Sequence, residues 1–480
     1  MSREIKPDLA HLEIAQMPPE QAIEELSDIA VRILIGAEVY EGHHFNPKLM
    51  RMTLGGMEQV LHKEDFNIAK WVADKVFREH IQAKNLQLMT TSIPYILKTR
   101  SIIHKVLTEY YAGMDNCCRV IILRGDNMGC GYWRIKLPGD YLRDQENDLI
   151  VRVSDVAIDY DQLVQYDVII VQRVFDYEQY YILSTLKDVG KKIVYEVDDD
   201  VFNVEPHNPC ANIYNRFDAQ ICMRHCLAIA DKVIVTSDRL AKALGIENKA
   251  ILYPNSLDWD MLFNVGKKDE TKTRKRIFWS GSNTHDEDFK VCMPALLRIF
   301  QEREDVELFI IGSLPPIIQH LLGDYMDRVI FIPGMHTEAF FQYLRFSLDA
   351  DVGIVPLANT IFNHSKSVCK GLEYTLARLP IIASGCPPYS DVFEQGKDAL
   401  LCNTDEEWYE SINSLLENEE MRDEMIRNAR LKAVEKFHLR KNAEHLGNEI
   451  SQLGSSLVND RISQRNQTQN QVEPLVAQPV

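Results

Sequence analysis

The chain has 480 residues and a formal net charge of −18, and apolar residues make up 45% of it. These values are typical of a globular protein with two to four domains and exclude a fibrous or disulfide-dense one. The acidic charge argues against nucleic acid as a partner, because phosphate backbones are bound through clustered Lys and Arg. The first residues are polar, and no run approaches 18 apolar residues. We therefore expect no signal peptide and no membrane span. The expected location is cytoplasmic, with peripheral membrane contact left open.

The hydrophobic pattern divides the chain into four parts. Residues 1–115 show helical periodicity without a chemical motif, so we expect an all-α N-terminal module. This module serves partner binding or oligomerisation, or it packs as a cap on the next domain. Residues 116–265 and 266–453 each alternate short β-branched runs with helical stretches, and the charged segment Gly266–Arg276 is the expected linker between them. Residues 454–480 are rich in Gln and Asn, and we expect them to be disordered.

The β–α alternation predicts two successive α/β domains, each a doubly wound parallel sheet with helices on both faces. The runs that we expect to be strands are Val120–Leu123, Val168–Val171, Lys192–Val197, Lys232–Thr236 and Ala250–Tyr253, then Ile277–Ser280, Glu307–Gly312, Val329–Ile332, Val352–Pro356 and Ile381–Ser384. In such sheets ligands bind at the carboxyl ends of the strands, so two facing sheets would hold one ligand between them.

Three strand ends carry residues suited to ligand binding, and the first is a glycine-rich segment, Arg124–Leu142. Its residues Gly129 and Gly131 would let the backbone turn sharply and approach a ligand. The segment matches neither a Walker loop nor the G-x-G-x-x-G pattern of dinucleotide-binding domains. An ordinary β–α turn explains it equally well.

The second strand end is Phe278–Phe289. Gly281 and Ser282 are expected to make the turn, and Thr284 with Glu287 has the spacing of a capping box, so we expect a helix to begin there. A helix start exposes free N–H groups that suit a phosphate. Any βα protein contains several capped helices, so a purely structural role also stays open.

The third strand end, Phe362–Ser384, is the most informative. We expect a helix over Ser367–Arg378, on which Lys366, Lys370 and Glu373 share one face near the N-terminus. Two lysines at a helix start suit a diphosphate, and a carboxylate one turn further suits a ribose diol, because it can accept both hydroxyl protons. The alternative is a surface Lys–Glu pair worth under ~0.5 kcal/mol.

These motifs resemble a known family. The segment Asn363–Ser384 resembles the donor-binding signature of the retaining group 1 glycosyltransferases, in which a Glu-containing helix precedes a strand of the form G-x-P-[VI]-[VI]-A-S. Here the strand reads RLPIIAS from Arg378. The segment Phe278–Phe289 and the strand end Tyr195–Phe202 are also similar to a bacterial and phage subset of these enzymes. The resemblance covers about residues 118–453 and implies a GT-B fold of two Rossmann-like domains.

The resemblance implies an enzyme that transfers a sugar, with retention, from a nucleotide-sugar donor of UDP or GDP type. The acceptor would be a glycan, a lipid-linked glycan or a protein, and neither metal nor cofactor would be needed. The residues that it assigns to the donor are Gly129, Gly131, Gly281, Ser282, Thr284, Lys366, Ser367, Lys370 and Glu373. The catalytic candidates are Asp198 and Asp199, which would orient the acceptor, and Lys370, which would stabilise the leaving diphosphate.

The sequence departs from the family pattern at three places. Many members have an Arg and a Lys in the turn after the first strand of the second α/β domain, where Ser282 and the acidic stretch Asp286–Asp288 stand here. Many members have a first glutamate that contacts the sugar, and Ser365 stands at that position. A histidine often ends the strand that finishes here in Asp198-Asp199-Asp200. This tripeptide contains a D-x-D, which binds a divalent metal in single-domain glycosyltransferases; an acceptor-side or structural role is the other reading. A nucleotide-sugar epimerase, a phosphorylase and a non-catalytic binding or assembly protein stay open as alternatives.

Overall fold

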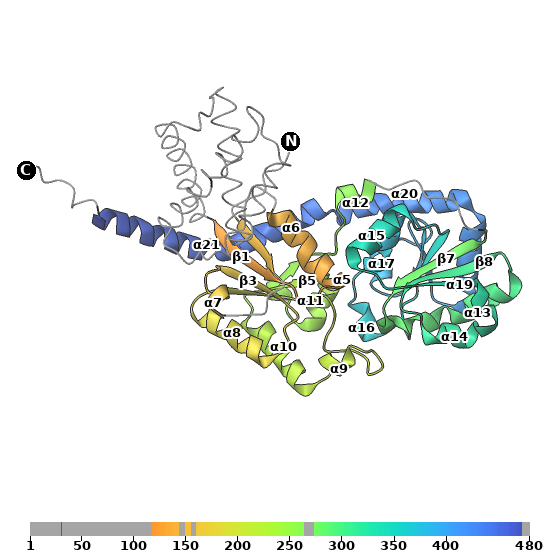
Figure 1. Ribbon diagram of the computed structural model, residues 1–480, viewed down its shortest axis with the longest axis horizontal. Coiled ribbons are helices and arrows are strands. Elements are labelled where there is room, and N and C mark those ends of the chain that lie inside the picture. The colour runs from red at the N-terminus through yellow and green to blue at the C-terminus, as the bar shows by residue number, and fades with distance from the viewer. Residues whose placement is uncertain (1–29, 31–116, 144–148, 155–159, 264–272, 473–480) are drawn as a thin grey trace, which may run out of the picture.

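The structure of the protein is a computed structural model that describes residue 30 and residues 117–143, 149–154, 160–263 and 273–472. This part of the chain forms two α/β domains that lie side by side. Two C-terminal helices run back along one edge, α20 (Glu419–Lys436) beside the second domain and α21 (Leu439–Val472) beside the first (Figure 1). The predicted all-α module at residues 1–115 lies outside the described residues, apart from Ala30.

The first domain is built on a parallel sheet of six strands in the order β2-β1-β3-β4-β5-β6. The strands are β1 (Cys118–Leu123), β2 (Leu149–Ser154), β3 (Val168–Gln172), β4 (Lys192–Glu196), β5 (Lys232–Val235) and β6 (Ala250–Leu252). The helical elements are α5 (Gly129–Gly131), the π-helical turn η3 (Tyr132–Lys136), α6 (Leu137–Arg143), α7 (Tyr160–Leu163), α8 (Tyr177–Asp188), α9 (Ala211–Tyr214), α10 (Phe217–Ile229), α11 (Asp238–Leu244), η4 (Glu247–Lys249) and α12 (Trp259–Phe263). All five residues of β3 are buried, as expected of a parallel strand covered on both faces.

The second domain is also a parallel six-stranded sheet, in the order β12-β11-β10-β7-β8-β9. Its strands are β7 (Lys275–Gly281), β8 (Val306–Gly312), β9 (Val329–Pro333), β10 (Val352–Val355), β11 (Ile381–Ser384) and β12 (Leu400–Cys402). The helical elements are η5 (Asn283–His285), η6 (Asp288–Val291), α13 (Met293–Glu302), α14 (Pro316–Leu321), η7 (Gly323–Arg328), α15 (Thr337–Phe346), α16 (Ile361–His364), α17 (Cys369–Ala377), α18 (Tyr389–Val392), α19 (Asp405–Glu417) and α20 (Glu419–Lys436), and the chain then returns to the first domain as α21 (Leu439–Val472). The two doubly wound, Rossmann-like sheets predicted from the sequence are confirmed.

Two local predictions are wrong. The expected linker Gly266–Arg276 ends inside a strand, because β7 already begins at Lys275. No α-helix begins at Thr284: the segment forms the 3-10 turn η5, without a side-chain cap bond. The first α-helix after β7 is α13, which begins at Met293. Glu287 instead pairs with Lys290, at 2.5 Å.

The last helix, α21, packs on the first sheet. Its apolar residues are buried in one cluster with strands of that sheet: Leu439, Ala443, Leu446 and Ile450. Gly447 and Gly454 let α21 approach closely, because a Cβ at Gly447 would clash with Leu142, and one at Gly454 would clash with Cys118. By chain order we expect the terminal helices in the second domain and a disordered tail from residue 454. In the structure α21 covers the first domain and continues to Val472.

The chain passes between the two domains at two neighbouring points. The first is the segment after β6, and the second is the junction of α20 and α21. They are hydrogen-bonded to each other, because Leu257 N donates to Phe437 O at 2.7 Å and Leu439 N donates to Leu257 O at 2.9 Å. The two crossings therefore form one short parallel pairing between the domains.

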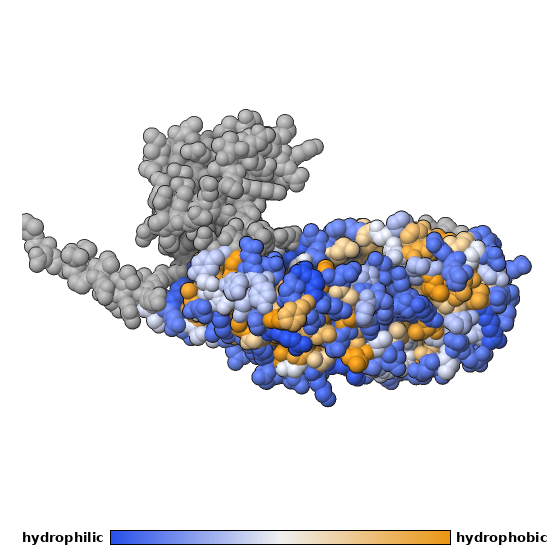
Figure 2. Space-filling model, turned by 90° about the horizontal axis from the view of Figure 1, so that it is seen from below, coloured by the Kyte–Doolittle hydropathy of each residue, from blue (hydrophilic) through white to orange (hydrophobic). Residues whose placement is uncertain are grey.

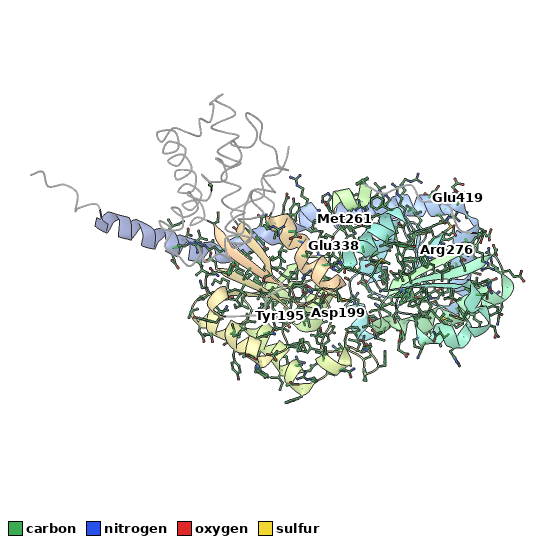
Figure 3. The ribbon with its side chains drawn as sticks, viewed as in Figure 1. Tyr195, Asp199, Met261, Arg276, Glu338 and Glu419 are labelled. Atoms are coloured by element: carbon green, nitrogen blue, oxygen red, sulfur yellow. The ribbon has the colours of Figure 1, made fainter. Side chains whose placement is uncertain are left out.

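Aromatic packing joins the domains beside η3. Tyr132 and Trp133 belong to the first domain but are buried in the main core cluster of the second. Each ring lies 5.1 Å, centroid to centroid, from the ring of Phe341 on α15. The Nζ atom of Lys136 lies 3.4 Å from a carboxylate oxygen of Glu338, which lies at the edge of the second domain that faces the first (Figure 3). This contact buries apolar surface and so stabilises the observed arrangement of the domains.

The outer surface is mostly hydrophilic on the face seen from below, with hydrophobic areas between the polar ones (Figure 2). Among the helices that the structure describes, none combines the length and the apolar character needed to cross a membrane.

The helix α17 ends at a strained residue, and this generates a first prediction. Arg378 caps the helix in the left-handed conformation, with φ +55°. This costs a residue with a Cβ roughly 1 kcal/mol, whereas glycine adopts it freely. We expect Arg378→Gly to raise the free energy of unfolding by ~0.5–1 kcal/mol and to raise the melting temperature.

The matched control is Arg427→Gly, on an exposed position inside α20. It should lower the free energy of unfolding by about 1 kcal/mol, because glycine is unfavourable inside a helix. If Arg378→Gly melts at or below the wild-type temperature, the conformation at this cap is not the source of strain that we infer.

Candidate functional site

The strand order of each sheet marks where a ligand is expected. In the first sheet β1 lies between β2 and β3, and in the second β7 lies between β8 and β10. The connection that follows β1 therefore leads toward one edge of the first sheet, and the connection that follows β3 leads toward the other edge. In the second sheet the connections that follow β7 and β10 diverge in the same way. Ligands of open α/β sheets bind outside the carboxyl ends of strands at such a switch point. The candidate site is built from the residues that follow these strands and β4.

In the first domain the acidic strand end after β4 is balanced by a cation from β3. Asp198 is buried, and its Oδ1 atom lies 3.7 Å from Nε of Arg173. Arg173 also pairs with Asp126 of the glycine-rich segment. Burial raises the pKa of Asp198, but Arg173, together with Arg134 and hydrogen bonds to the carboxylate, outweighs it and the net pKa is lowered, so this carboxylate stays ionised. Arg173 has a left-handed backbone, with φ +48°. Such strain in a non-glycine residue often marks a functional site.

The glycine-rich segment folds tightly around Asp126. The Asp126 carboxylate accepts from Met128 N at 2.8 Å and from Gly131 N at 3.1 Å. Gly131 has no room for a Cβ, which would clash with the Asp126 carbonyl oxygen, whereas a Cβ at Gly129 would meet open space. The need for glycine at position 131 is therefore explained within the loop. Cys130, between them, contributes to lowering the pKa of Asp198.

In the second domain the helix α17 brings its first turn to the end of β7. Tyr374 of this helix donates from its hydroxyl to Ile354 O of β10 at 2.9 Å. Its ring fills the space that a side chain at Gly353 would occupy. Gly371 similarly allows the ring of Phe393 to pack against the helix. These contacts fix the height of α17 over the sheet and hence the position of its two charged residues, Lys370 and Glu373.

Lys370 is oriented by a histidine that the sequence motifs did not single out. Nζ of Lys370 lies 2.9 Å from Nε2 of His285, and Nδ1 of His285 lies 2.7 Å from Oδ2 of Asp288. Burial lowers the pKa of His285 to about 3, and the charge of Lys370 adds to this. The imidazole is therefore neutral, so Nδ1–H donates to Asp288 and Nε2 accepts from the lysine. Asp288 in turn accepts from Ala358 N and from Asn363 Nδ2, at 2.8 and 2.7 Å.

Within the described part of the chain, Glu373 makes two long side-chain contacts. Ser280 Oγ donates to one carboxylate oxygen at 3.5 Å, and Cys369 Sγ donates to the other at 3.8 Å. Burial raises the pKa of Glu373 from its ordinary value of 4.5 to about 7, against the opposing charge of Lys370. Burial likewise lowers the pKa of Lys370. Glu373 is thus a poorly satisfied acceptor that a ligand with hydroxyl donors would complete.

The two halves of the site meet at Lys366. Its Nζ atom lies 3.7 Å from Oδ1 of Asp199, and Asp199 lies between the two domains (Figure 3). Burial lowers the pKa of Lys366, but neighbouring carboxylates, Asp199 first, outweigh it and the net pKa is raised. A second contact joins the domains beside this pair, because Asn255 Nδ2 donates to Ser367 Oγ at 3.0 Å. The start of α17 therefore faces the strand end of β4.

Packing within the second domain, and not ligand binding, explains the glycine in the turn after β7. A Cβ at Gly281 would clash with the ring of Trp279. Gly281 also pairs with Gly312 of β8. Ser282 and Thr284 are joined by a hydrogen bond of 2.7 Å between their hydroxyls. They lie at the start of η5, beside His285, but the structure shows no contact between them and Lys366, Lys370 or Glu373.

The third aspartate of the acidic strand end has a structural role. Asp200 is buried and accepts from Phe202 N at 3.3 Å and from Asn203 Nδ2 at 2.9 Å, so it stabilises the turn that follows. Among the described residues, no group of three or more His, Cys, Asp or Glu side chains has an arrangement that could hold a metal ion. The D-x-D reading therefore finds no support in this part of the chain.

The pKa of Glu373 generates a prediction on stability. Because the folded-state pKa lies above the unfolded value, ionisation penalises the folded state. The penalty is absent below about pH 4.5, grows as the pH rises toward 7, and is complete above it. Glu373→Gln removes the charge. Its free energy of unfolding should match that of the wild type near pH 4.5 and exceed it at pH 8, by on the order of 2 kcal/mol.

Thermal unfolding of both proteins across this pH range measures the difference. Glu410→Gln, on the exposed face of α19, is the control for loss of a carboxylate outside the site. A Glu373→Gln variant that is less stable than the wild type at pH 8 would show that the buried carboxylate is stabilised by its neighbours.

Comparisons with known proteins agree with this architecture. Residues 263–432 match the family model described as Glycosyl transferases group 1. Among solved structures, HepE of Anabaena in complex with UDP-glucose is 14% identical, with a TM-score of 0.51 over 70% of this chain and 99% of that chain. A glycosyltransferase from Rickettsia africae is 12% identical, with a TM-score of 0.51 over 70% of this chain and 99% of that one.

Sucrose-phosphate synthase from Thermosynechococcus elongatus is 14% identical, with a TM-score of 0.50 over 71% of this chain and 100% of that one. None of the curated proteins matches the chain. At these identities the structural likeness shows a shared fold. The chain therefore has the two-domain GT-B fold, and its second domain matches the group 1 glycosyl transferases.

Proposed function

We propose that the protein is a glycosyltransferase that uses a nucleoside diphosphate-sugar as donor and a hydroxyl group as acceptor. The observation that carries the proposal is the start of α17, where Lys366, Lys370 and Glu373 lie together at the switch point of the second sheet and face Asp199 of the first domain. Two cations and one carboxylate in this order suit a diphosphate followed by a ribose. The match of residues 263–432 to the group 1 family supports the same donor class.

In this proposal Glu373 accepts hydrogen bonds from both ribose hydroxyls, which replaces its two long contacts with stronger ones. Lys370, oriented by neutral His285, and Lys366 lie against the diphosphate. As the bond between the sugar C1 and the diphosphate oxygen breaks, negative charge grows on the leaving group, and both lysines stabilise it. His285 and Asp288 are positioning residues, because they act through Lys370.

The acceptor lies on the side of the first domain. Its hydroxyl oxygen forms the new bond to C1, and its proton passes to the departing diphosphate, so atoms and charge balance. The proposed stereochemistry is retention, because the hydroxyl attacks from the face that the diphosphate leaves. Asp199 is the better placed of the two aspartates to orient this hydroxyl, since it is partly exposed and its only ion-pair partner within the described chain is Lys366. Asp198 keeps Arg173 in place and is buried.

Donor binding is the first test. Titration with UDP-glucose, GDP-mannose and ADP-glucose should identify one nucleotide-sugar that binds and is turned over. Lys370→Ala should weaken that binding about 10- to 100-fold, because it removes a charged hydrogen-bond donor from the diphosphate. Glu373→Ala should weaken it similarly by leaving the ribose hydroxyls unpaired.

Lys397→Ala is the control, because this exposed lysine of the second domain pairs with Glu394 away from the site. Full activity in both site variants would refute the site. Failure of the wild type to bind any nucleotide-sugar would favour a non-catalytic binding protein. An epimerised nucleotide-sugar formed without acceptor would favour an epimerase.

The raised pKa of Glu373 gives the binding a pH dependence. The ionised carboxylate is the form that accepts two hydroxyl donors, whereas the free site holds a proton up to about pH 7. Affinity for the nucleotide-sugar should therefore rise as the pH increases from 5.5 to 8, with release of a proton below pH 7. Calorimetry in buffers of different ionisation enthalpy measures this proton. Glu373→Gln should bind more weakly, with no such rise.

A further inference from the structure

Four aromatic rings gather on the surface of the first domain, away from the candidate site. Tyr177, Tyr180 and Tyr181 lie on one face of α8, at i, i+3 and i+4, and His225 of the neighbouring α10 completes the group. Neighbouring ring centroids are 5.4–6.1 Å apart, the shortest distance being that between Tyr180 and His225. We call these four residues the ring platform.

The inner side of the ring platform packs against the first domain, and its outer side is exposed. Tyr177 and Tyr180 pack partly against the core of the first domain. Asp176 fixes the start of α8, because its side chain accepts from Glu178 N and Gln179 N at 2.9 and 3.2 Å. In contrast, 64% of Tyr181 is exposed, and His225 is exposed. Within the described chain no hydrogen bond joins the three phenol hydroxyls to other residues.

The ring platform is connected to the candidate site by further aromatic residues. Phe175, two residues before Tyr177, lies 6.2 Å from the ring of Tyr214 on α9. Tyr214 is near Arg173 and Asp198, whose charges both act on its hydroxyl. Figure 1 places α8, α9 and α10 along one side of the first domain, with α9 nearest the second domain. On this same side, Figure 2 shows pale and hydrophobic areas among the hydrophilic ones. Aromatic surface therefore extends from the strand ends outward.

We propose that the ring platform binds a neutral glycan chain, and that this chain is the acceptor whose growing end reaches the candidate site. This rests on the proposed function and names the acceptor class. Pyranose rings have an apolar C–H face and an equatorial rim of hydroxyls. Tyrosine offers the matching surface, a rigid ring with a polar tip and low conformational entropy. We take the glycan to be neutral because the exposed acidic residues Asp176 and Glu178 flank Tyr177, whereas nearby Asp218 is paired with Arg216.

Binding of immobilised maltohexaose, cellohexaose, chitohexaose and mannohexaose to the full-length protein tests the proposal without the transfer reaction. At least one should bind. Tyr181→Ala combined with His225→Ala, both at exposed positions, should weaken that binding about tenfold, because two stacking rings are lost. Tyr181→Phe should keep most of it. Phe346→Ala removes an exposed ring on the second domain and should leave the binding unchanged.

Two further measurements separate this site from the donor site. The double variant should keep the wild-type melting temperature and affinity for the nucleotide-sugar. Its kcat/KM toward the hexasaccharide that binds should fall, whereas its kcat/KM toward the corresponding methyl monosaccharide should stay at the wild-type value. The proposal is overturned if none of the four glycans binds, if the double variant binds as well as the wild type, or if it changes the oligomeric state, since the rings would then contact a second copy of the chain. If the wild type binds no nucleotide-sugar, the proposed function is overturned instead.

Discussion

The site depends on a buried guanidinium group that lies where the domains meet. The side chains of Arg134 and Glu196 are fully buried and joined by a bond of 2.7 Å. Arg134 also donates to Tyr253 O at 2.5 Å and to Asn255 Oδ1 at 3.0 Å. The group thereby holds together η3, the end of β4 and the segment that leaves β6. Asn255 then reaches across to Ser367, so the position of α17 relative to the first domain depends on the same contacts.

Such a pair is costly to disturb, because loss of one partner leaves an unpaired charge in the interior. Burial raises the pKa of Glu196 to about 7, against the attraction of Arg134. The pair fixes Glu196, the last residue of β4, just before Asp198 and Asp199. It gives these carboxylates a fixed backbone even though their own side chains are balanced only at longer range, by Arg173 and Lys366.

The sequence pattern is sufficient for the sheets but not for all their strands. Ten strands were predicted from apolar, β-branched runs, and all ten are present with small shifts at the ends. The two that were missed, β2 and β12, are the edge strands beside β1 and β11. β12 has only three residues, Leu400–Cys402, too few to be distinguished from a loop by sequence pattern. β2 has six residues, but a charged residue, Arg152, interrupts its apolar run.

The candidate site could be predicted from the sequence only where its residues are close together along the chain. The helical spacing of Lys370 and Glu373 places both on one face from sequence alone. The partners of these residues come from distant segments: His285, Asp288 and Ser280 for the second domain, and Asp199 for Lys366. His285 follows the end of β7 by only a few residues, and that position was the one signal available for it. The predicted capping box failed because Thr284 bonds Ser282 and Glu287 bonds Lys290.

The paired crossings at Leu257 and Phe437–Leu439 restrict how the two domains can move. Two chain segments that are hydrogen-bonded side by side allow rotation about their common direction but resist sliding and twisting of one domain against the other. A rotation about this line leaves the backbone bonds of Leu257 intact and changes the separation of Lys366 from Asp199. Because the first crossing follows Asn255, the rotation axis begins next to the residue that contacts α17. The crossing segments therefore lie beside the contact that joins the first domain to α17, and a rotation about them would separate or approach the two halves of the candidate site.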